Sequence, residues 1–360
     1  MIIIATLEIF YEGKNITQDI SPFITAFTLT DNAGAKADDL SLTLEDRESL
    51  WLTHWMPSKS DMIAVTVIDE DGKSAHGWPA FRVDEIDYTI PPHSITIKAK
   101  SVSIKSSLQY EQHNRAWENI TLETVANDIA QSHGLELFYD AEEIFIERRE
   151  QIHSADLRFL ETLCDSFGLN VKVSDNKLII YSQNDYDSHD SIMTISPDYD
   201  RLISVKFSSK SAKIYRKARV TYHQPVKNET YEAEYEDNDE EGSEEELEIY
   251  QHVDNQAQAE SVAKDMLKKS NSAEITAILT LKGSVYYMAG VNITLDNFGM
   301  FSGKYFVENV THSVTNSGYT VAMTLKMGAG SKSALKQRKA KSQGKKSSGG
   351  EILADDSFGY

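Results

Sequence analysis

The chain has 360 residues, of which 40% are hydrophobic and 26% are charged, and this composition is typical of a globular protein with two or three domains. Its single cysteine excludes an internal disulfide and any zinc site that is built from cysteines. The formal net charge of -20 opposes non-specific binding to nucleic acid or to an anionic membrane, because both are polyanions. No segment approaches the ~18 consecutive apolar residues of a transmembrane helix, so we expect no membrane insertion.

The N-terminal segment MIIIATLEIF predicts a buried strand rather than a signal peptide. It has no basic residue ahead of its apolar run, and Glu8 interrupts that run early. Apolar residues then alternate with Thr6 and Glu8, as they do in a half-buried strand. We therefore expect that the protein is made and folded in the cytoplasm.

Residues 1–105 predict a first β-barrel-like domain. Turn residues separate its apolar segments, and Asp71-Gly72 between two of them predicts a β-hairpin. Short strands at this spacing indicate an antiparallel sandwich or small barrel. The segments that alternate apolar and polar residues, and are rich in β-branched side chains, are 23–30, 40–46, 62–69, 81–90 and 94–101.

Residues 106–187 predict a small α/β insertion made of two helix-strand units. The segments 119–140 and 153–175 resemble each other at an offset of 34 residues, and each predicts a helix followed by a strand. Thr121 and Ser154 are the expected N-caps of the two helices. Gly134 and Gly168 stand where a helix ends on a residue with positive φ.

Residues 188–327 predict a second β-barrel-like domain, with one amphipathic helix at about 255–269. Between 232 and 248 there are eleven acidic residues and no basic one, which predicts a solvated loop because such a block repels itself. The expected strands are 202–209, 213–223, 274–283, 291–296, 304–314 and 318–327.

Residues 328–360 predict a flexible basic C-terminal arm. Between 331 and 346 it has seven Lys and Arg residues and no acid, and it ends in the apolar and acidic segment EILADDSFGY. Binding to nucleic acid is one alternative, but no aromatic residues are interleaved with the basic ones. We favour an arm that tethers the protein to another protein.

The sequence contains no recognisable catalytic, cofactor-binding or metal-binding motif. It has no His-Glu-x-x-His, no phosphate-binding Walker loop, no Gly-x-Ser-x-Gly and no dinucleotide fingerprint. His113, His133 and His153 are twenty residues apart, a spacing that fits no ligand set on one helix or strand. Cys164 lies on the apolar stripe of its predicted helix, which indicates a buried thiol. We therefore predict no enzyme activity, no cofactor and no metal ligands.

Two other functions remain open at this stage. Abundant carboxylates are compatible with a cell-wall (peptidoglycan) hydrolase, although nothing singles out one acid in an apolar pocket. Calcium binding by the acidic block at 232–248 is not expected, because the block lacks the ligand spacing of an EF-hand loop. A carbohydrate-binding protein is the other alternative, but we favour core or interface positions for the four tryptophans. These are Trp51, Trp55, Trp78 and Trp117.

Two stretches of the chain form recognisable motifs. The first motif runs from Arg148-Arg149-Glu150-Gln151 through Ser154-Ala155-Asp156 to Phe167-Gly168-Leu169. The second begins at the helix 257–267 and ends in the hairpin that contains Gly303-Lys304-Tyr305, Val310-Thr311-His312 and Gly318-Tyr319. Together they resemble the phage late control protein D family, whose members are hub proteins of contractile tails, and the hub portion of type VI secretion spike proteins. The acidic block at 232–248 has no counterpart that we assign.

The resemblance implies a structural baseplate hub of a phage tail or tail-like contractile injection system. Such hubs are homotrimers in which two related β-barrel domains per subunit adapt a six-fold tail tube to a three-fold spike. The implied partners are other copies of the chain, the tail tube protein, the spike protein through the arm at 328–360, and other baseplate and tape-measure proteins. The implied location is the virion or particle tail, and no specific nucleic acid is expected as a partner.

Overall fold

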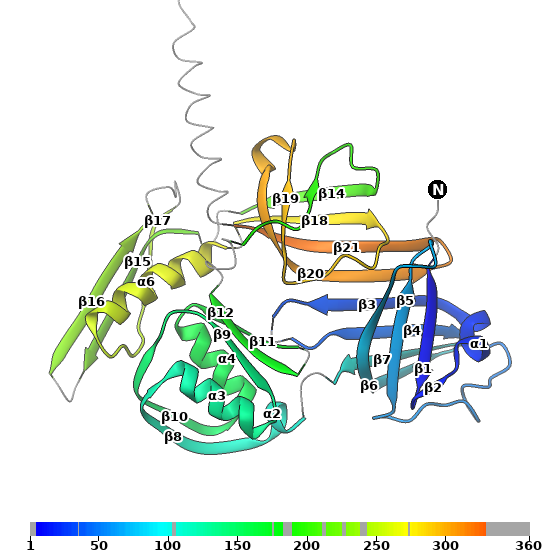
Figure 1. Ribbon diagram of the computed structural model, residues 1–360, viewed down its shortest axis with the longest axis horizontal. Helices are drawn as coiled ribbons and strands as arrows, with labels where there is room; N and C mark the ends of the chain where they lie inside the picture. The colour runs from blue at the N-terminus through cyan, green and yellow to red at the C-terminus, as the bar shows by residue number, and fades with distance from the viewer. Residues whose placement is uncertain are drawn as a thin grey trace, which may run out of the picture.

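The computed structural model of the protein describes residues 5–34, 36–102, 106–174, 176–182, 189–210, 214–224, 228–237, 243–272 and 274–328. The described chain is mainly β (Figure 1), and it has two hydrophobic cores. One core gathers residues from 5–102, 189–210 and 275–328, which we call the sheet body. The other gathers residues from 106–182 and 214–272, which we call the mixed body. Each body is therefore built from stretches that are separated in the sequence.

The N-terminal half of the sheet body contains all the strands that were expected there. Strands β4 and β5 alternate buried and half-buried residues, as their period-two pattern predicts. Gly72 has a φ of +64° in the turn between β5 and β6, and the predicted hairpin is confirmed. The elements are β1 (Thr6–Tyr11), β2 (Lys14–Asn15), α1 (Thr17–Ile20), η1 (Ser21–Phe23), β3 (Ile24–Asn32), β4 (Asp39–Glu45), β5 (Met62–Ile68), β6 (Ala75–Thr89) and β7 (Ser94–Ser101).

The C-terminal half of the sheet body continues the same sheet. Strand β20 pairs with β3, so that Thr311 lies opposite Thr30, and their hydroxyl oxygens are 3.1 Å apart. This pairing joins the two β units into one 13-stranded sheet. The elements are β13 (Thr194–Ile195), β14 (Leu202–Ser209), β18 (Ile275–Lys282), β19 (Asn292–Leu295), η2 (Gly299–Phe301), β20 (Gly303–Thr315) and β21 (Gly318–Met327).

The mainly β class with an α/β insertion is confirmed, but closed barrels are not seen among the described strands. The main path of the sheet runs from β14 through β20 and β3 to β2, and these two end strands are not paired with each other. The two β units that we expected as separate domains thus share one open sheet. The reason is that the long strand β20 pairs with β19 along its first half and with β3 along its second.

The insertion is the larger part of the mixed body, and its repeated helix-strand units are confirmed. Thr121 caps α3, since its hydroxyl oxygen accepts a hydrogen bond from the backbone N–H of Thr124 at 3.2 Å. Gly134 and Gly168 end the two helices with φ of +62° and +74°. The elements are α2 (Ser106–Tyr110), β8 (Gln112–Thr121), α3 (Leu122–Ser132), β9 (Glu136–Asp140), β10 (Phe145–Ala155), α4 (Asp156–Ser166), β11 (Leu169–Ser174) and β12 (Lys177–Ser182).

The expected N-cap of the second helix is wrong. The residue before α4 is Ala155, and no side chain makes a capping bond there. Ser154 instead stays in strand β10, where its backbone carbonyl accepts a hydrogen bond from Gln151. The first helical residue is Asp156, whose carboxylate is held by other parts of the insertion.

The expected solvated loop at 232–248 is also wrong for its described residues, because they form strands. Strands β15 (Tyr215–Gln224), β16 (Glu229–Glu236) and β17 (Ser243–Ile249) make a three-stranded sheet, and α6 (Gln256–Asn271) packs against it. Ala233 and Ile249 alternate with the glutamates and are buried. The opposite side chains pair with cations, as Glu234 does with Arg219 at 2.6 Å. Residues 238–242 lie outside the described residues.

The sheet of β15–β17 also divides the predicted second β domain. Its residues 214–272 pack with the insertion in the mixed body, while the rest of 188–327 belongs to the sheet body. Apart from Gly328, the predicted C-terminal arm lies outside the described residues. Among the described helices, none is long and apolar enough to cross a bilayer.

Candidate functional site

The first sequence motif converges on one buried carboxylate, that of Asp156. Gln151 donates a hydrogen bond to its Oδ1 at 2.7 Å, and Arg115 and His133 each reach its Oδ2 at 2.9 Å. Burial alone raises the pKa of this carboxyl group, but the hydrogen bonds from Gln151 and His133 and the charge of Arg115 outweigh burial, so that the pKa is lowered. The motif therefore ties strands β8 and β10 and helix α3 to the start of α4.

A serine extends this cluster into a hydroxyl–imidazole–carboxylate series. Ser107 Oγ lies 2.9 Å from Nδ1 of His133, whose Nε2 contacts Asp156. In nucleophilic catalysis the carboxylate stabilises the imidazolium that forms when histidine takes the serine proton. Here the guanidinium of Arg115 already neutralises the same oxygen, and it would repel an imidazolium. The geometry therefore supports a structural role for Ser107, in which it connects α2 to His133, and not a role as a nucleophile.

The three histidines that were compared in the sequence do not all meet. His113 Nε2 lies 3.7 Å from Asp156 Oδ2, next to His133. His153 is exposed and has a φ of +45°. The sequence offered no signal for the convergence of two of them, because it depends on how β8 packs against the helices.

A second group of polar side chains, which sequence reasoning missed, joins the insertion to the segment before α6. Potential ligand atoms of Glu147, His252 and Asp254 lie within 4.8 Å of one another. However, Arg149 Nη1 lies 2.6 Å from Nδ1 of His252, so a guanidinium already supplies the positive charge at this group. Burial lowers the pKa of Arg149, and the nearby charge of Asp254 acts in the opposite direction. The absence of a metal ligand set stays a prediction.

Residues of the second motif contact both halves of the sheet body. His312 of β20 is fully buried opposite Leu29 of β3, and its Nδ1 is hydrogen-bonded to the hydroxyl of Tyr319 at 2.7 Å. Its ring centroid lies 5.0 Å from that of Trp78 on β6. Burial lowers the pKa of His312 to about 4, so the imidazole is neutral at neutral pH.

Tyr319, at the end of this motif, packs directly against the backbone of Gly283. The Tyr319 ring lies so close to Gly283 that a Cβ on that glycine would sit 2.1 Å from the ring. The Gly283 N–H donates to the Tyr319 carbonyl oxygen at 2.9 Å. Position 283 must therefore be glycine, because any side chain there would overlap the buried ring of Tyr319.

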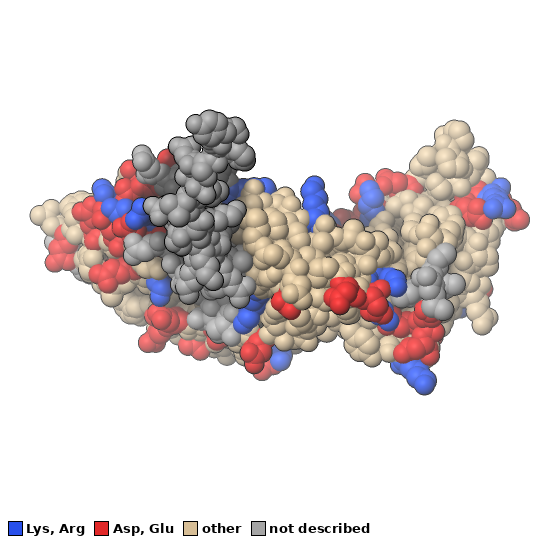
Figure 2. Space-filling view, turned by 90° about the horizontal axis from the view of Figure 1, so that it is seen from above, with Lys and Arg blue, Asp and Glu red and all other residues tan. Residues whose placement is uncertain are grey.

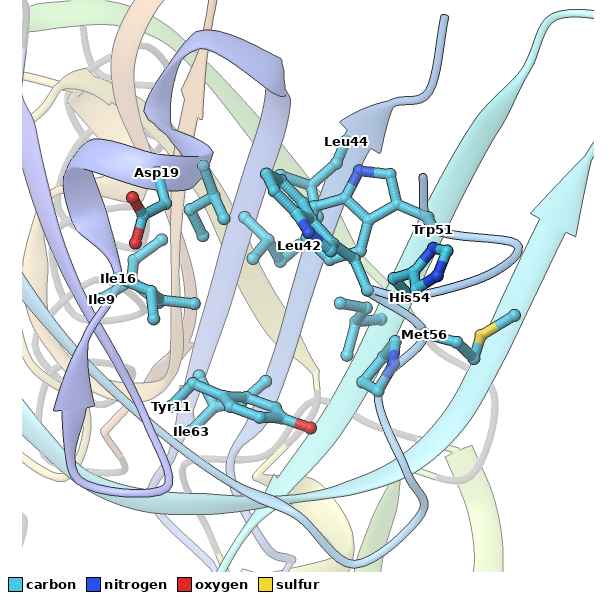
Figure 3. Close-up of a pocket in the computed structure, with 14 residues that line it drawn as sticks. Ile9, Tyr11, Ile16, Asp19, Leu42, Leu44, Trp51, His54, Met56 and Ile63 are labelled. Atoms are coloured by element: carbon cyan, nitrogen blue, oxygen red, sulfur yellow. The ribbon is translucent and has the colours of Figure 1, made fainter. Parts of the chain in front are cut away.

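An apolar cavity of about 370 Å³ opens near β1, β4 and the segment that follows β4 (Figure 3). Trp51 is buried at its wall and makes an edge-to-face contact with Trp55, with 5.4 Å between the ring centroids. Trp55 is 38% exposed, and Leu52 and Met56 beside it are each 42% exposed. Figure 3 shows that Ile9 and Ile16 lie across the cavity from Trp51. Exposed apolar side chains around a cavity are typical of a protein-contact surface.

The tryptophans and the cysteine fit the favoured interpretation. Trp51 and Trp78 are buried in the sheet body, Trp117 is half-buried beside Arg115, and Trp55 stands at the cavity rim. Cys164 is fully buried, and burial raises the pKa of its thiol to about 12, which makes it a poor nucleophile.

Known proteins resemble the chain both in sequence and in fold. A family model described as YQBQ-like matches residues 188–326. A probable baseplate hub protein of Escherichia phage P2 is 27% identical over 178 residues, which cover 47% of this chain and 43% of that protein. A probable baseplate hub protein of Escherichia phage 186 is 25% identical over 169 residues, covering 46% of this chain and 42% of the relative. These matches span less than half the length of the curated relatives.

The similarity in fold extends over most of the chain. The 43 kDa tail protein of prophage MuSo2 from Shewanella oneidensis aligns with a TM-score of 0.68 at 14% identity. The alignment covers 90% of this chain and 98% of that one. Together with the matches to probable baseplate hub proteins, this fold confirms the resemblance to tail hub proteins that the two motifs predicted.

Proposed function

We propose that the protein is a structural baseplate hub of a contractile phage tail or tail-like particle, and that three copies adapt a six-fold tail tube to a three-fold spike. The observation that carries the proposal is the β3–β20 pairing, which holds a seven-stranded and a six-stranded β unit in one sheet. Three copies would offer six such units toward a tube, while the complex keeps three-fold symmetry toward a spike. The similarity to probable baseplate hub proteins supports this role.

The exposed edge of the sheet body supports self-association. Among the described strands, β14 pairs only with β18, which leaves the backbone groups of its other edge available to a neighbouring chain. Ile203 on β14 is 53% exposed, and Ile278 on β18 is 46% exposed. Closed homo-oligomers commonly bury such edges and apolar side chains.

The other partners follow from the same role. We propose contacts with the tail tube protein, with the spike protein through residues 328–360, and with other baseplate and tape-measure proteins. The location is then the tail of the particle, after assembly in the bacterial cytoplasm. The role is not enzymatic, in keeping with the neutralised carboxylate of Asp156 and the buried thiol of Cys164.

Sedimentation-velocity centrifugation of the full chain at micromolar concentration tests the oligomeric state. We expect a single species with three times the mass of the chain. A monomer or a dimer at that concentration would contradict the proposal. Incubation with purified peptidoglycan should release no muropeptides; release that tracks the protein through purification would favour the hydrolase alternative.

Deletion of residues 329–360 tests the contact with the spike. We expect the truncated chain to keep the mass of the complex and to lose co-purification with the spike protein encoded in the same tail gene cluster. Unchanged co-purification would remove the arm from the spike contact without affecting the proposed trimer.

A further inference from the structure

The sheet of β15–β17 has one covered face and one open face. Ala218 and Val220 of β15 and Ala233 of β16 are buried, and α6 contacts both of these strands. Side chains alternate between the two faces of a strand, so the intervening residues point away from α6. We call this second face the acidic face; it carries Lys217, Arg219, Glu232, Glu234, Glu236, Glu246 and Glu248.

The acidic face has more carboxylates than cations. Glu234 lies 2.7 Å from Lys217 Nζ and 2.6 Å from Arg219 Nη2, and Arg219 Nε lies 3.1 Å from Glu246. Glu236 pairs with Arg216 at the beginning of β15, at 2.8 Å. The acidic face therefore carries five carboxylates, and among the described residues only three cations pair with them: Lys217 and Arg219 on the same face, and Arg216 beside it.

The surplus charge lies at the two edges of the acidic face. Glu232 on β16 lies 4.0 Å from Arg219, the limit of an ion pair. Glu248 on β17 accepts a hydrogen bond from a neutral donor, the hydroxyl of Tyr250, at 2.7 Å. The hydrogen bond to Glu248 and its charge raise the pKa of Tyr250. Figure 2 shows red side chains, with blue ones among them, at the end of the molecule that carries this sheet.

The basic segment of the chain emerges beside this sheet. The last described residue, Gly328, follows β21, whose Lys326 lies opposite Thr276 near the start of β18. A few residues before β18, the Asn271 side chain at the end of α6 bonds both the N–H and the carbonyl oxygen of Tyr215, at 3.0 and 2.7 Å. Tyr215 is the first residue of β15, so the arm leaves the described structure close to one end of the acidic face (Figure 1).

The chemistry and length of residues 331–346 fit this surface. The segment carries seven Lys and Arg residues and no acid. Fully extended, a chain from Gly328 to residue 346 reaches at most about 60 Å, whereas a ten-residue strand such as β15 is about 33 Å long. The segment can therefore run along the whole acidic face.

We propose that the basic segment 331–346 docks on the acidic face of its own chain. Docking compensates the surplus carboxylates at both edges of the sheet, and it directs the remaining residues, 347–360, away from a fixed point on the mixed body. The contact is electrostatic and multivalent, so it weakens as salt screens the charges. It does not depend on the proposed trimer.

Zero-length carbodiimide cross-linking of the full chain tests the docking directly. We expect amide links between lysines of 331–346 and Glu232 or Glu248 at low salt, and their loss at high salt. A mixture of isotope-labelled and unlabelled chains distinguishes the two possible origins of the arm. Links found only between labelled and unlabelled chains would overturn docking within one chain and place the arm on a neighbouring copy.

Trypsin provides a second measurement, because the segment contains the cleavage sites. We expect the double variant Glu232→Gln/Glu248→Gln to be cleaved within 331–346 about fivefold faster than the wild type at about 20 mM NaCl, and equally fast at about 500 mM NaCl. The matched control, Glu48→Gln/Glu70→Gln, removes two exposed carboxylates from the N-terminal β unit and should keep the wild-type rate. Thermal melting checks that both variants are folded.

Two further results would refute the proposal. One is equal cleavage of the wild type and the Glu232→Gln/Glu248→Gln variant at low salt. The other is a set of cross-links from 331–346 that are spread over the surface without preference for the acidic face.

Discussion

At the scale of single residues, His312 and Asp156 are two buried ionisable groups that are held in opposite ways. His312 is neutral, because its ring is enclosed between β3, β6 and β21 and burial disfavours the charged imidazolium. Asp156 is charged, because three side chains donate hydrogen bonds to it. Each holds together elements that are distant in the chain, and each makes the stability depend on pH over a different range.

The buried imidazole of His312 predicts a loss of stability between pH 6.5 and about 4. Its pKa falls from 6.5 to about 4 on folding, so in this window the unfolded chain binds a proton that the folded chain does not. The free energy of unfolding should therefore decrease by about 1.4 kcal/mol per pH unit, or about 3 kcal/mol over the window. Urea unfolding at several pH values measures this decrease in the free energy of unfolding. His312→Phe should lose this slope, whereas His153→Gln, at an exposed histidine, should retain it.

Replacement of Asp156 by asparagine should destabilise the mixed body by about 3 kcal/mol, because it leaves Arg115 and His133 without their anionic partner. The lowered pKa of Asp156 means that its contribution is present above the ordinary value of 3.8 and is lost as the pH falls below it. Chemical denaturation at pH 7 measures the change. Glu150→Gln, which breaks an exposed ion pair with Arg148, is the control and should have little effect.

The contact between Gly283 and Tyr319 predicts that Gly283→Ala destabilises the sheet body by about 3 kcal/mol, since a methyl group would overlap the buried ring. Gly34→Ala is the matched control, because a Cβ at Gly34 would have no atom within 4 Å. Thermal denaturation of both variants should show a lower melting temperature only for Gly283→Ala. An unchanged melting temperature would mean that the ring has room to move aside.

At the scale of elements, the two helices of the insertion begin in different ways although their sequences resemble each other. Helix α3 begins with a side-chain cap from Thr121. Helix α4 has no such cap, and its first residue, Asp156, is instead fixed by groups from β8, β10 and α3. The repeat predicts the two helices and their glycine stops correctly, but the start of α4 is decided by the tertiary cluster.

This difference predicts unequal effects of two similar substitutions. Thr121→Ala should cost about 1 kcal/mol of the free energy of unfolding, because the N–H of Thr124 loses its partner. Ser154→Ala should cost less than about 0.5 kcal/mol, because its side chain caps no helix. Urea denaturation of the two variants provides the comparison. A larger loss for Ser154→Ala would indicate a role of its hydroxyl in strand β10.

At the scale of the whole molecule, the sheet body and the mixed body each combine an early and a late part of the chain. The late segment 214–272 packs on the insertion, and the two β units meet at β3 and β20. The protein can therefore present two β units on one side and separate surfaces of the mixed body to other partners. This arrangement suits a hub that has several neighbours.

The exposed edge of the sheet body carries the prediction at this scale. Ile203→Glu on β14 should lower the mass of the complex in sedimentation, because a charge would be buried if this edge lies in the proposed trimer interface. Ile152→Glu introduces the same charge at a residue that is 63% exposed in the insertion, and it should leave the complex intact. If both variants remain trimeric, the edge of β14 lies outside the interface.

Most strands and helices can be located from the amino-acid sequence, because alternation, apolar stripes and glycine stops are properties of neighbouring residues. The segment 202–209, for example, was predicted as a strand and forms β14 (Leu202–Ser209). Which strands pair and which polar groups converge depends on contacts between residues that are far apart in the chain. Thr30 and Thr311 are 281 positions apart, and no local pattern records that they meet. The loop predicted for 232–248 is wrong because its glutamates are neutralised by residues on another strand, Lys217 and Arg219. Which glutamate meets which cation depends on the register between the strands, and that register is not visible in the local sequence.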